Sequence, residues 1–265
     1  MVDDLVSIII PTHNRSEYVK RAIQSCLDQT YEDIEVIVVD DASTDNTEGV
    51  VTSFSDERVT YVRNDENLGA PKTRNRGLDL ARGEYINFLD DDDELLPEKV
   101  REQVALFQTS DVSRLGVVTC DVLMIRGDEE DLRRNRKQGR IYKDLLTSYC
   151  VHGTETMLIK REALADVRFD PSFASNQEYD LSLQLAQSWG FDYVPKLLSR
   201  KYASKNQIST DYDKKLDGTK TLWHKYKEEY KDHGVYVYNL ARFAYLLFRY
   251  NVGKYFGRSA HNVLP

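Results

Sequence analysis

The sequence predicts an α/β protein with a mostly parallel sheet flanked by helices and a helical C-terminal extension. Short β-branched runs, nearly free of polar side chains, alternate along the first 125 residues with segments whose apolar positions recur every three to four residues. Such alternation implies crossover connections, and therefore a parallel sheet that is covered on both faces. From residue 214 onward the pattern is helical and rich in tyrosine.

Each expected element has a local signal. The predicted strands are the apolar runs 6–11, 34–39, 59–62, 85–89 and 116–125. Asn14 faces Glu17 in a capping-box-like helix start, and a helix that begins at Pro71 is expected to be capped by Gly83. Pro97 begins the next helix, and residues 180–189 are helical by pattern. The densely charged segment 127–143 is expected to be a mobile surface loop, because nothing in it offers an anchor to the core.

The composition excludes several classes of protein. The 265 residues carry 44 acidic and 36 basic side chains, a net charge of −8, and 41% are hydrophobic. Disordered and collagen-like chains are excluded, and the acidic balance argues against a nucleic-acid partner. The amino terminus is acidic where a secretory signal is basic, and no run reaches the roughly 18 apolar residues of a spanning helix. A cytoplasmic protein, at most peripheral at the cytoplasmic face of the membrane, is expected.

Polar residues follow three of the predicted strands. These are Thr12-His13-Asn14 after the first strand, Asp40-Asp41 after the second and Asp90-Asp91-Asp92-Asp93 after the fourth. In parallel sheets, ligands bind at the carboxyl ends of the strands. The three groups are therefore expected at one edge of the sheet.

The four adjacent aspartates are the sharpest feature. Carboxylates this close repel one another, and a divalent cation compensates that repulsion. Oxygen ligands suit Mg²⁺ or Mn²⁺ that holds a diphosphate. The alternative is a solvated acidic turn at the start of the following helix. A calcium loop is excluded, because the sixth position from Asp90 is Leu95 and the twelfth is Arg101.

The other polar groups suggest a nucleotide. Asp40 and Asp41 suit hydrogen bonds to a nucleobase or to ribose hydroxyls, although capping of the next helix is an alternative. Lys72, Arg74 and Arg76 offer cations for phosphate, with a solvated helix face as their alternative.

Five motifs in order resemble a known family. The sequence reads Val6-Ser7-Ile8-Ile9-Ile10-Pro11-Thr12-His13-Asn14-Arg15, then Gln29-Thr30-Tyr31, Val38-Val39-Asp40-Asp41-Ala42-Ser43, Asn67-Leu68-Gly69 with Arg74-Asn75, and Phe88-Leu89-Asp90-Asp91-Asp92-Asp93. These runs are similar to the successive motifs of family 2 inverting glycosyltransferases. The resemblance implies a GT-A fold, which is Rossmann-like, a nucleotide-diphosphate-sugar donor and a divalent metal, Mg²⁺ or Mn²⁺. It also implies a catalytic domain over residues 1–212, with a nucleotide-sugar-binding half at 1–125 and an acceptor-binding half at 126–212, before an extension at 213–265.

The resemblance assigns roles to individual residues. Donor binding falls to Pro11, Thr12, Asn14, Asp40, Asp41, Lys72, Arg74 and Asp91. Asp92, together with Asp90, would hold the metal.

A later segment matches the family's catalytic carboxylate. It reads Gln177-Glu178-Tyr179-Asp180-Leu181, with Glu178 where Asp is common. Glu reaches one methylene farther and has a similar pKa, so it can still take a proton from an acceptor hydroxyl. Asp180 is the second candidate base, and stabilisation of a helix amino terminus is its alternative role. Ser204 stands where many relatives have His, so Lys201 or Lys205 is expected to supply charge for phosphate.

The expected activity is transfer of a sugar to a glycan or lipid-linked acceptor. The alternatives are a non-catalytic nucleotide-sugar-binding subunit and, less favoured, a sugar nucleotidyltransferase, which would carry a Gly-rich loop where Pro11 and Thr12 stand. The aromatic C-terminal helix could contact a membrane surface, or it could pack on the catalytic domain or on a partner in a homo-oligomer.

Overall fold

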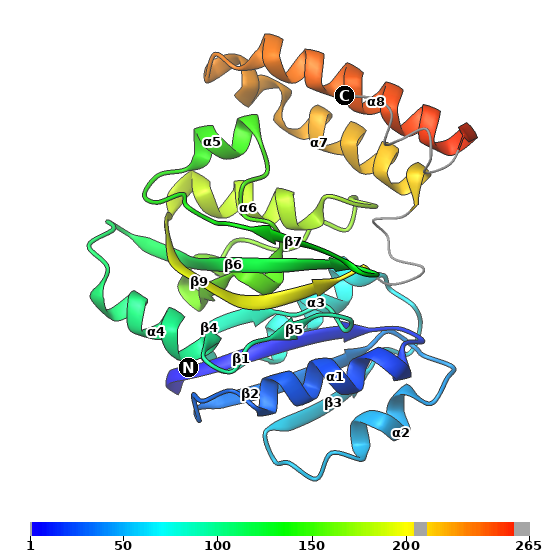
Figure 1. Cartoon of the computed structure of the whole chain (residues 1–265), viewed down its shortest axis with the longest axis vertical. Coiled ribbons are helices and arrows are strands. Elements are labelled where there is room, and N and C mark those ends of the chain that lie inside the picture. Colours follow the sequence, from blue (N-terminus) through cyan, green and yellow to red (C-terminus); the bar gives the residue numbers. More distant parts are fainter. Residues whose placement is uncertain (1, 204–210, 257–265) are drawn as a thin grey trace.

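The protein is a twisted sheet with helices on both faces, and a helical hairpin packs beside one of the helical layers (Figure 1). The computed structural model describes residues 2–203 and 211–256. In that part of the chain the strands are β1 (Val2–Thr12), β2 (Ile34–Asp40), β3 (Val59–Arg63), β4 (Gly83–Phe88), β5 (Glu94–Leu95), β6 (Leu115–Arg126), β7 (Glu129–Arg133), β8 (Leu158–Lys160) and β9 (Gly190–Tyr202).

The helices lie between these strands and after them. They are α1 (Ser16–Leu27), α2 (Thr47–Thr52), α3 (Ala70–Leu80), α4 (Lys99–Thr109), α5 (Tyr142–Thr147), α6 (Gln177–Ser188), α7 (Tyr212–Asp232) and α8 (Tyr236–Phe256), with the short 3-10 turns η1 (Thr154–Thr156) and η2 (Arg161–Leu164). The predicted α/β class with a mostly parallel sheet and C-terminal helices is confirmed.

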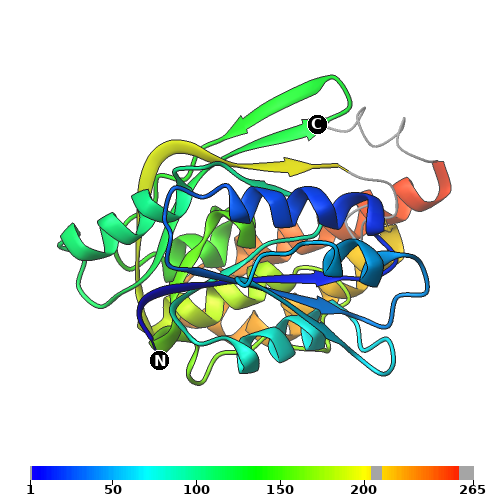
Figure 2. The ribbon, with the colours of Figure 1, turned by 90° about the horizontal axis from the view of Figure 1, so that it is seen from below.

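The sheet has the order β3-β2-β1-β4-β8-β6-β9-β5. Strand β7 pairs with residues 122–126 of β6, beyond the two residues of β6 that pair with β8. The first four strands in this order are parallel to one another. Strand β8 is antiparallel to both of its neighbours, so β6 is not the parallel neighbour of β4 that simple alternation suggests. Strands β6 and β7 form an antiparallel hairpin that extends beyond the helical layers (Figure 2).

Alternate side chains of β1 point into two separate hydrophobic cores. Ile8 and Ile10 face the cluster that α1, α2 and α4 cover. Ile9 faces the larger cluster that α3, α5, α6 and α7 cover. Strands covered on both faces must be apolar on both, which explains why the first strands read as unbroken apolar runs.

Three local predictions are wrong. Gly83 is not a helix cap: it lies in β4, where an added Cβ would come within 2.5 Å of the Leu5 carbonyl oxygen. The segment 127–143 is not a free loop, because it contains β7 and the start of α5. It is anchored by Asn135, which is 2% exposed and donates to the carbonyls of Cys120 and Val151. Asn14 does not cap α1, whose N-cap residue is Arg15 with no side-chain capping bond.

Candidate active site

The polar ends of β1, β2 and β4 meet at one edge of the sheet, as expected from parallel topology. Thr12 stands opposite Asp40 in the β1–β2 register, and the amide of Asp41 donates to the Thr12 carbonyl at 2.8 Å. The Thr12 hydroxyl donates to Asp91 Oδ2 at 2.8 Å. Thr12 therefore links all three strand ends, with its backbone carbonyl towards β2 and its side chain towards β4.

Asp40 and Asp41 are held by neutral donors. Asp40 is fully buried and accepts from the Ser43 amide at 2.8 Å and from the Tyr61 hydroxyl at 2.6 Å. Asp41 accepts from the Asn64 side chain at 2.7 Å and from the amides of Leu68 and Gly69, each at 2.8 Å. These bonds fix the loops after β2 and before α3, so both carboxylates have a structural role whatever ligand they meet.

Asn14 has a similar task. Its backbone is in the left-handed region, with φ of 52°, and its side-chain oxygen accepts from the amides of Thr44 and Asp45 at 2.7 and 3.3 Å. Asn14 thus ties the turn after β1 to the loop after β2. Among the other predicted donor-binding residues, Pro11 is buried opposite Val39, and Lys72 is exposed on the first turn of α3.

Asp91 and Asp92 share one cation. Arg15 Nη1 lies 2.8 Å from Asp91 Oδ1 and 3.1 Å from Asp92 Oδ2. Burial raises the pKa of Asp91 from 3.8 to about 7, although Arg15 opposes the rise. For Asp91, the cost of burying the charged form therefore outweighs the favourable charge of Arg15.

Asp90 points away from Arg15 and contacts Arg74 and Lys201 instead. Arg74, which is 6% exposed, donates to Asp90 Oδ1 at 2.6 Å and to Gln177 Oε1 at 2.8 Å. Burial would raise the pKa of Asp90, but Arg74 and Lys201 outweigh it and lower the pKa to about 2. A role for Asp90 beside Asp92 on a metal stays a prediction, because the structure pairs Asp92 with Asp91 instead.

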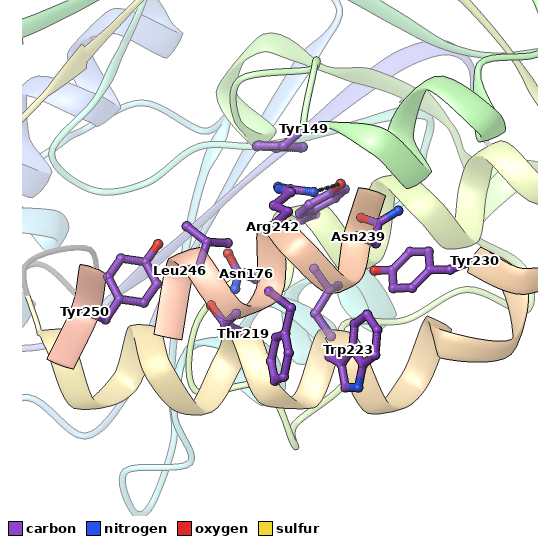
Figure 3. Close-up of a pocket in the computed structure, with 12 residues that line it drawn as sticks. Tyr149, Asn176, Thr219, Trp223, Tyr230, Asn239, Arg242, Leu246 and Tyr250 are labelled. Carbon is purple, nitrogen blue, oxygen red and sulfur yellow. Dashed lines mark hydrogen bonds between the residues drawn. The ribbon is translucent and has the colours of Figure 1, made fainter. Parts of the chain in front are cut away.

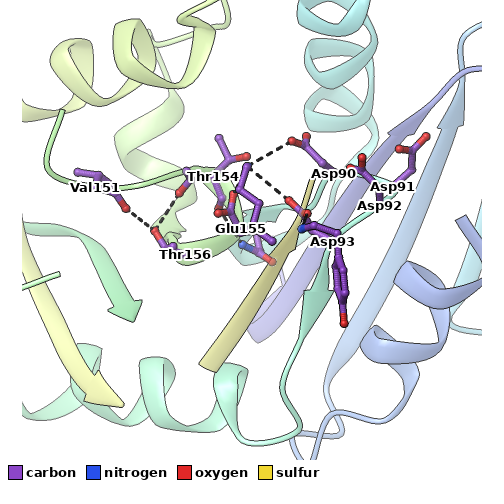
Figure 4. Close-up of polar contacts among 12 residues, drawn as sticks. Asp90, Asp91, Asp92, Asp93, Val151, Thr154, Glu155 and Thr156 are labelled. Carbon is purple, nitrogen blue, oxygen red and sulfur yellow. Dashed lines mark hydrogen bonds and ion pairs between the residues drawn. The ribbon is translucent and has the colours of Figure 1, made fainter. Parts of the chain in front are cut away.

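Lys201 is surrounded by three carboxylates. Its Nζ lies 3.0 Å from Glu155, 3.4 Å from Asp93 and 3.7 Å from Asp90. Asp91 and Asp92 lie on the side of the acidic motif away from Glu155 (Figure 4). Burial works to lower the pKa of Lys201, but Glu155, Asp93 and Asp90 outweigh it, so the ammonium group stays charged. Lys201 is therefore committed to this cluster rather than free for phosphate, and Ser204 and Lys205 lie outside the described residues.

The two candidate bases differ sharply. Glu178 is half-buried in the first turn of α6, and the positive charges of Arg74 and Lys201 are close enough to interact with it. Asp180 is fully buried and accepts from the Tyr226 hydroxyl at 2.8 Å, with Lys225 Nζ also at 2.8 Å. Both partners belong to α7, so Asp180 joins α6 to the C-terminal hairpin.

The acidic motif fits a hard divalent cation. Among the described residues, no three Asp, Glu, His or Cys side chains converge on one point. Two carboxylates do converge, because those of Asp91 and Asp92 both contact the same nitrogen atom of Arg15. Mg²⁺ and Mn²⁺ are commonly held by one or two carboxylates, with water and phosphate oxygens as the other ligands.

Residues 7–168 match the model of Glycosyl transferase family 2. The chain is 31% identical over 204 residues to the amylovoran biosynthesis glycosyltransferase AmsB of Erwinia amylovora, covering 73% of this chain and 67% of AmsB. It is 30% identical over 257 residues to WfgD of Escherichia coli, covering 93% and 92%. WfgD is named a UDP-Glc:α-D-GlcNAc-diphosphoundecaprenol β-1,3-glucosyltransferase. The chain therefore belongs to glycosyltransferase family 2 and is a glycosyltransferase.

Solved structures show the same fold. S. aureus TarS in complex with UDP-GlcNAc superposes with a TM-score of 0.67 at 18% identity, covering 92% of this chain and 81% of the TarS chain. The mannosyltransferase PcManGT of Pyrobaculum calidifontis, in complex with GDP-Man and Mn²⁺, gives 0.64 at 20% identity, covering 91% and 71%. These neighbours have the GT-A fold that the motifs implied.

Sequence reasoning missed two charged residues of the site. Arg15 stands inside a recognised motif, but its partners are 76 and 77 positions away. Glu155 lies in an otherwise unremarkable run, and only the fold brings Lys201 to it. The one available signal was the motif that contains Arg15.

Proposed function

We propose that this glycosyltransferase moves a sugar from a nucleotide-diphosphate donor to an acceptor hydroxyl, with a divalent metal and with inversion at the anomeric carbon, in the synthesis of a polysaccharide or glycolipid. One observation supports this most: Arg74 contacts both Asp90 of the acidic motif and Gln177 beside Glu178. Arg74 thus lies between the acidic motif, which would bind the leaving diphosphate, and the first turn of α6, which carries the residue that would take the acceptor proton.

The donor half follows from the sheet edge. The nucleoside would lie against Thr12, Asp40 and Asp41, and its diphosphate would lie towards Asp91 and Asp92. A divalent cation held by Asp92, with Asp91 or Asp90, would offset the negative charge of the leaving diphosphate. Arg15 would have to share or yield its position between the two carboxylates, and its guanidinium could then pair with phosphate oxygens.

The proton is taken by Glu178. Its carboxylate accepts the proton of the acceptor hydroxyl as that oxygen forms a bond to the anomeric carbon, while the bond from this carbon to the diphosphate oxygen breaks. Attack opposite the leaving group gives inversion. Asp180 is a poor alternative as the base, because Lys225 and Tyr226 of α7 already contact its carboxylate oxygens.

The test is a screen of nucleotide sugars with Mn²⁺ or Mg²⁺, followed by proton NMR of the product's anomeric coupling. The wild type should give a product of inverted configuration. Glu178→Gln should lower kcat/KM by roughly a hundredfold or more, whereas the exposed control Glu162→Gln should leave it unchanged. A retained configuration, or a fully active Glu178→Gln enzyme, would contradict the proposal.

The acceptor is proposed to be lipid-linked, since WfgD, with which this chain aligns over most of its length, is named for such an acceptor.

None of the described helices has the length and apolarity to cross a bilayer. Helix α8 does present an outward apolar face, with Val237 80%, Leu240 44% and Phe248 57% exposed. We expect this face to rest on an anionic bilayer, because α8 contains basic residues and no acidic ones. Leu240→Ser with Phe248→Ser should abolish cosedimentation with phosphatidylglycerol vesicles; unchanged binding would refute the contact. The cytoplasmic location stays a prediction.

A further inference from the structure

A cavity of about 150 Å³ lies between the C-terminal hairpin and the first turn of α6. Helices α7 and α8 form most of its wall, and the catalytic domain supplies Tyr149, Asn176 and Tyr179 (Figure 3). Its lining combines aromatic rings, among them Trp223 and Tyr250, with a few polar groups. Aromatic walls with a small number of fixed polar groups are typical of a ligand site.

Arg242 is the charged group of this cavity. Its Nη1 donates to the Thr147 carbonyl and to the Tyr179 hydroxyl, both at 3.2 Å. No carboxylate in the described part of the chain forms an ion pair with it, although the rest of the molecule is rich in such pairs. A partly buried guanidinium that only neutral oxygens contact is left without the counter-charge that burial calls for.

The surroundings are also electropositive. Helix α8 contains Arg242, Arg249 and Lys254 and no acidic residue, in a chain whose net charge is −8. This helix therefore favours anions more than the chain as a whole does.

The cavity adjoins the proposed catalytic base. Asn176 and Tyr179 line it, and they flank Glu178 in the same helical turn. Tyr149 lies between the cavity and Glu178. Its ring packs on that of Tyr179 with centroids 5.0 Å apart, and the negative charge of Glu178 adds to the burial that raises the pKa of its hydroxyl. A group in the cavity thus belongs to the acceptor side of the reaction.

The space is sufficient for a phosphate group, because a cavity of about 150 Å³ can hold a small ligand such as benzene.

We infer that this cavity binds the phosphate of the acceptor, with Arg242 as the anion-binding residue, so that a sugar attached to that phosphate presents its hydroxyl to Glu178. The inference rests on the proposed function and deepens it, because it specifies an acceptor that carries a phosphate next to the sugar that is extended.

The test compares two acceptors: N-acetylglucosaminyl diphosphate with a short alkyl chain, and the matching alkyl glycoside without phosphate. The wild type should prefer the diphosphate in kcat/KM by roughly ten- to a hundredfold, the range of one or two charge-assisted hydrogen bonds. In Arg242→Gln this preference should fall towards one. Lys220→Gln removes a charge from the exposed surface of the same hairpin, where Lys220 faces Asp217 at 3.6 Å, and should keep the preference.

A measurement on the wild type alone guards against a variant that fails to fold. A short alkyl diphosphate should inhibit competitively against the acceptor and not against the nucleotide sugar. Equal use of both acceptors by the wild type, an Arg242→Gln enzyme that keeps the preference, or inhibition competitive only with the donor would each overturn the inference. Failure of the proposed function looks different: the wild type would then transfer sugar to neither acceptor.

Discussion

The two aspartate clusters at the sheet edge hold their charge in different ways. Asp40 and Asp41 are surrounded by neutral donors: a tyrosine hydroxyl, an asparagine side chain and backbone amides. Asp91 and Asp92 instead share the guanidinium of Arg15. The first pair is held by neutral hydrogen-bond donors, whereas the second is paired with a charged side chain.

This difference indicates which carboxylates have a structural role and which can bind a ligand. A carboxylate fixed by backbone amides cannot release its partners without unfolding a loop, so Asp41 shapes the donor site by holding the chain before α3. A carboxylate paired with a side chain can exchange that side chain for another cation. The acidic motif after β4 is accordingly the place where a metal and a diphosphate can enter.

The largest expected effect is on catalysis. Asp92→Asn should lower kcat/KM by roughly a hundredfold or more, because it removes charge at the point where the diphosphate leaves. The melting temperature should stay within a few degrees, since the variant relieves repulsion from Asp91. Steady-state kinetics and thermal unfolding check both parts. A fully active Asp92→Asn enzyme would contradict the catalytic role of the acidic motif, and with it the difference proposed between the two clusters.

Asp41→Ala should act mainly on stability. It leaves the Asn64 side chain and the amides of Leu68 and Gly69 without their acceptor, so the free energy of unfolding should drop by roughly 3 kcal/mol. Urea denaturation measures this. The exposed control Asp79→Ala, which loses only a long 3.5 Å pair with Arg168, should change it by less than about 0.5 kcal/mol. Equal losses would show that Asp41 is not a framework residue.

The smallest expected effect is on the pH dependence of stability. The folded-state pKa of Asp91, about 7, is above the ordinary 3.8 because of burial, so the protonated form is favoured by folding. Its stabilising contribution is complete below about pH 4 and is lost as the pH rises towards 7. The unfolding free energy of Asp91→Asn, measured without metal between pH 4 and 8, should fall less steeply than that of the wild type. Parallel curves would contradict the assignment.

The first half of the fold was predictable because its signals are local. Strands β1, β2 and β4 are largely apolar runs, since helices cover both of their faces. Strand β7 escaped prediction because its five residues are all exposed and mostly charged, and only pairing with β6 makes them a strand. Strand β8 has three residues, too few for a pattern.

The candidate site divides in the same way. The aspartates could be found because they follow strands directly, and parallel topology then brings them together. Lys201 and Glu155 could not be paired from the sequence, because their 3.0 Å contact joins β9 to the η1 turn. The structural role of Asp180 was equally hidden, since Lys225 and Tyr226 approach it from α7, some 45 residues away.

The central claim is that the cation binds at the acidic motif after β4 and not at the Asp40–Asp41 pair. Electron paramagnetic resonance of Mn²⁺, titrated with the nucleoside diphosphate product present and corrected for its own metal binding, tests this directly. Wild type and Asp40→Asn should bind Mn²⁺ with similar affinity, and Asp92→Asn should bind it at least about tenfold more weakly. Unchanged binding by Asp92→Asn, or an equal loss in Asp40→Asn, would contradict the account.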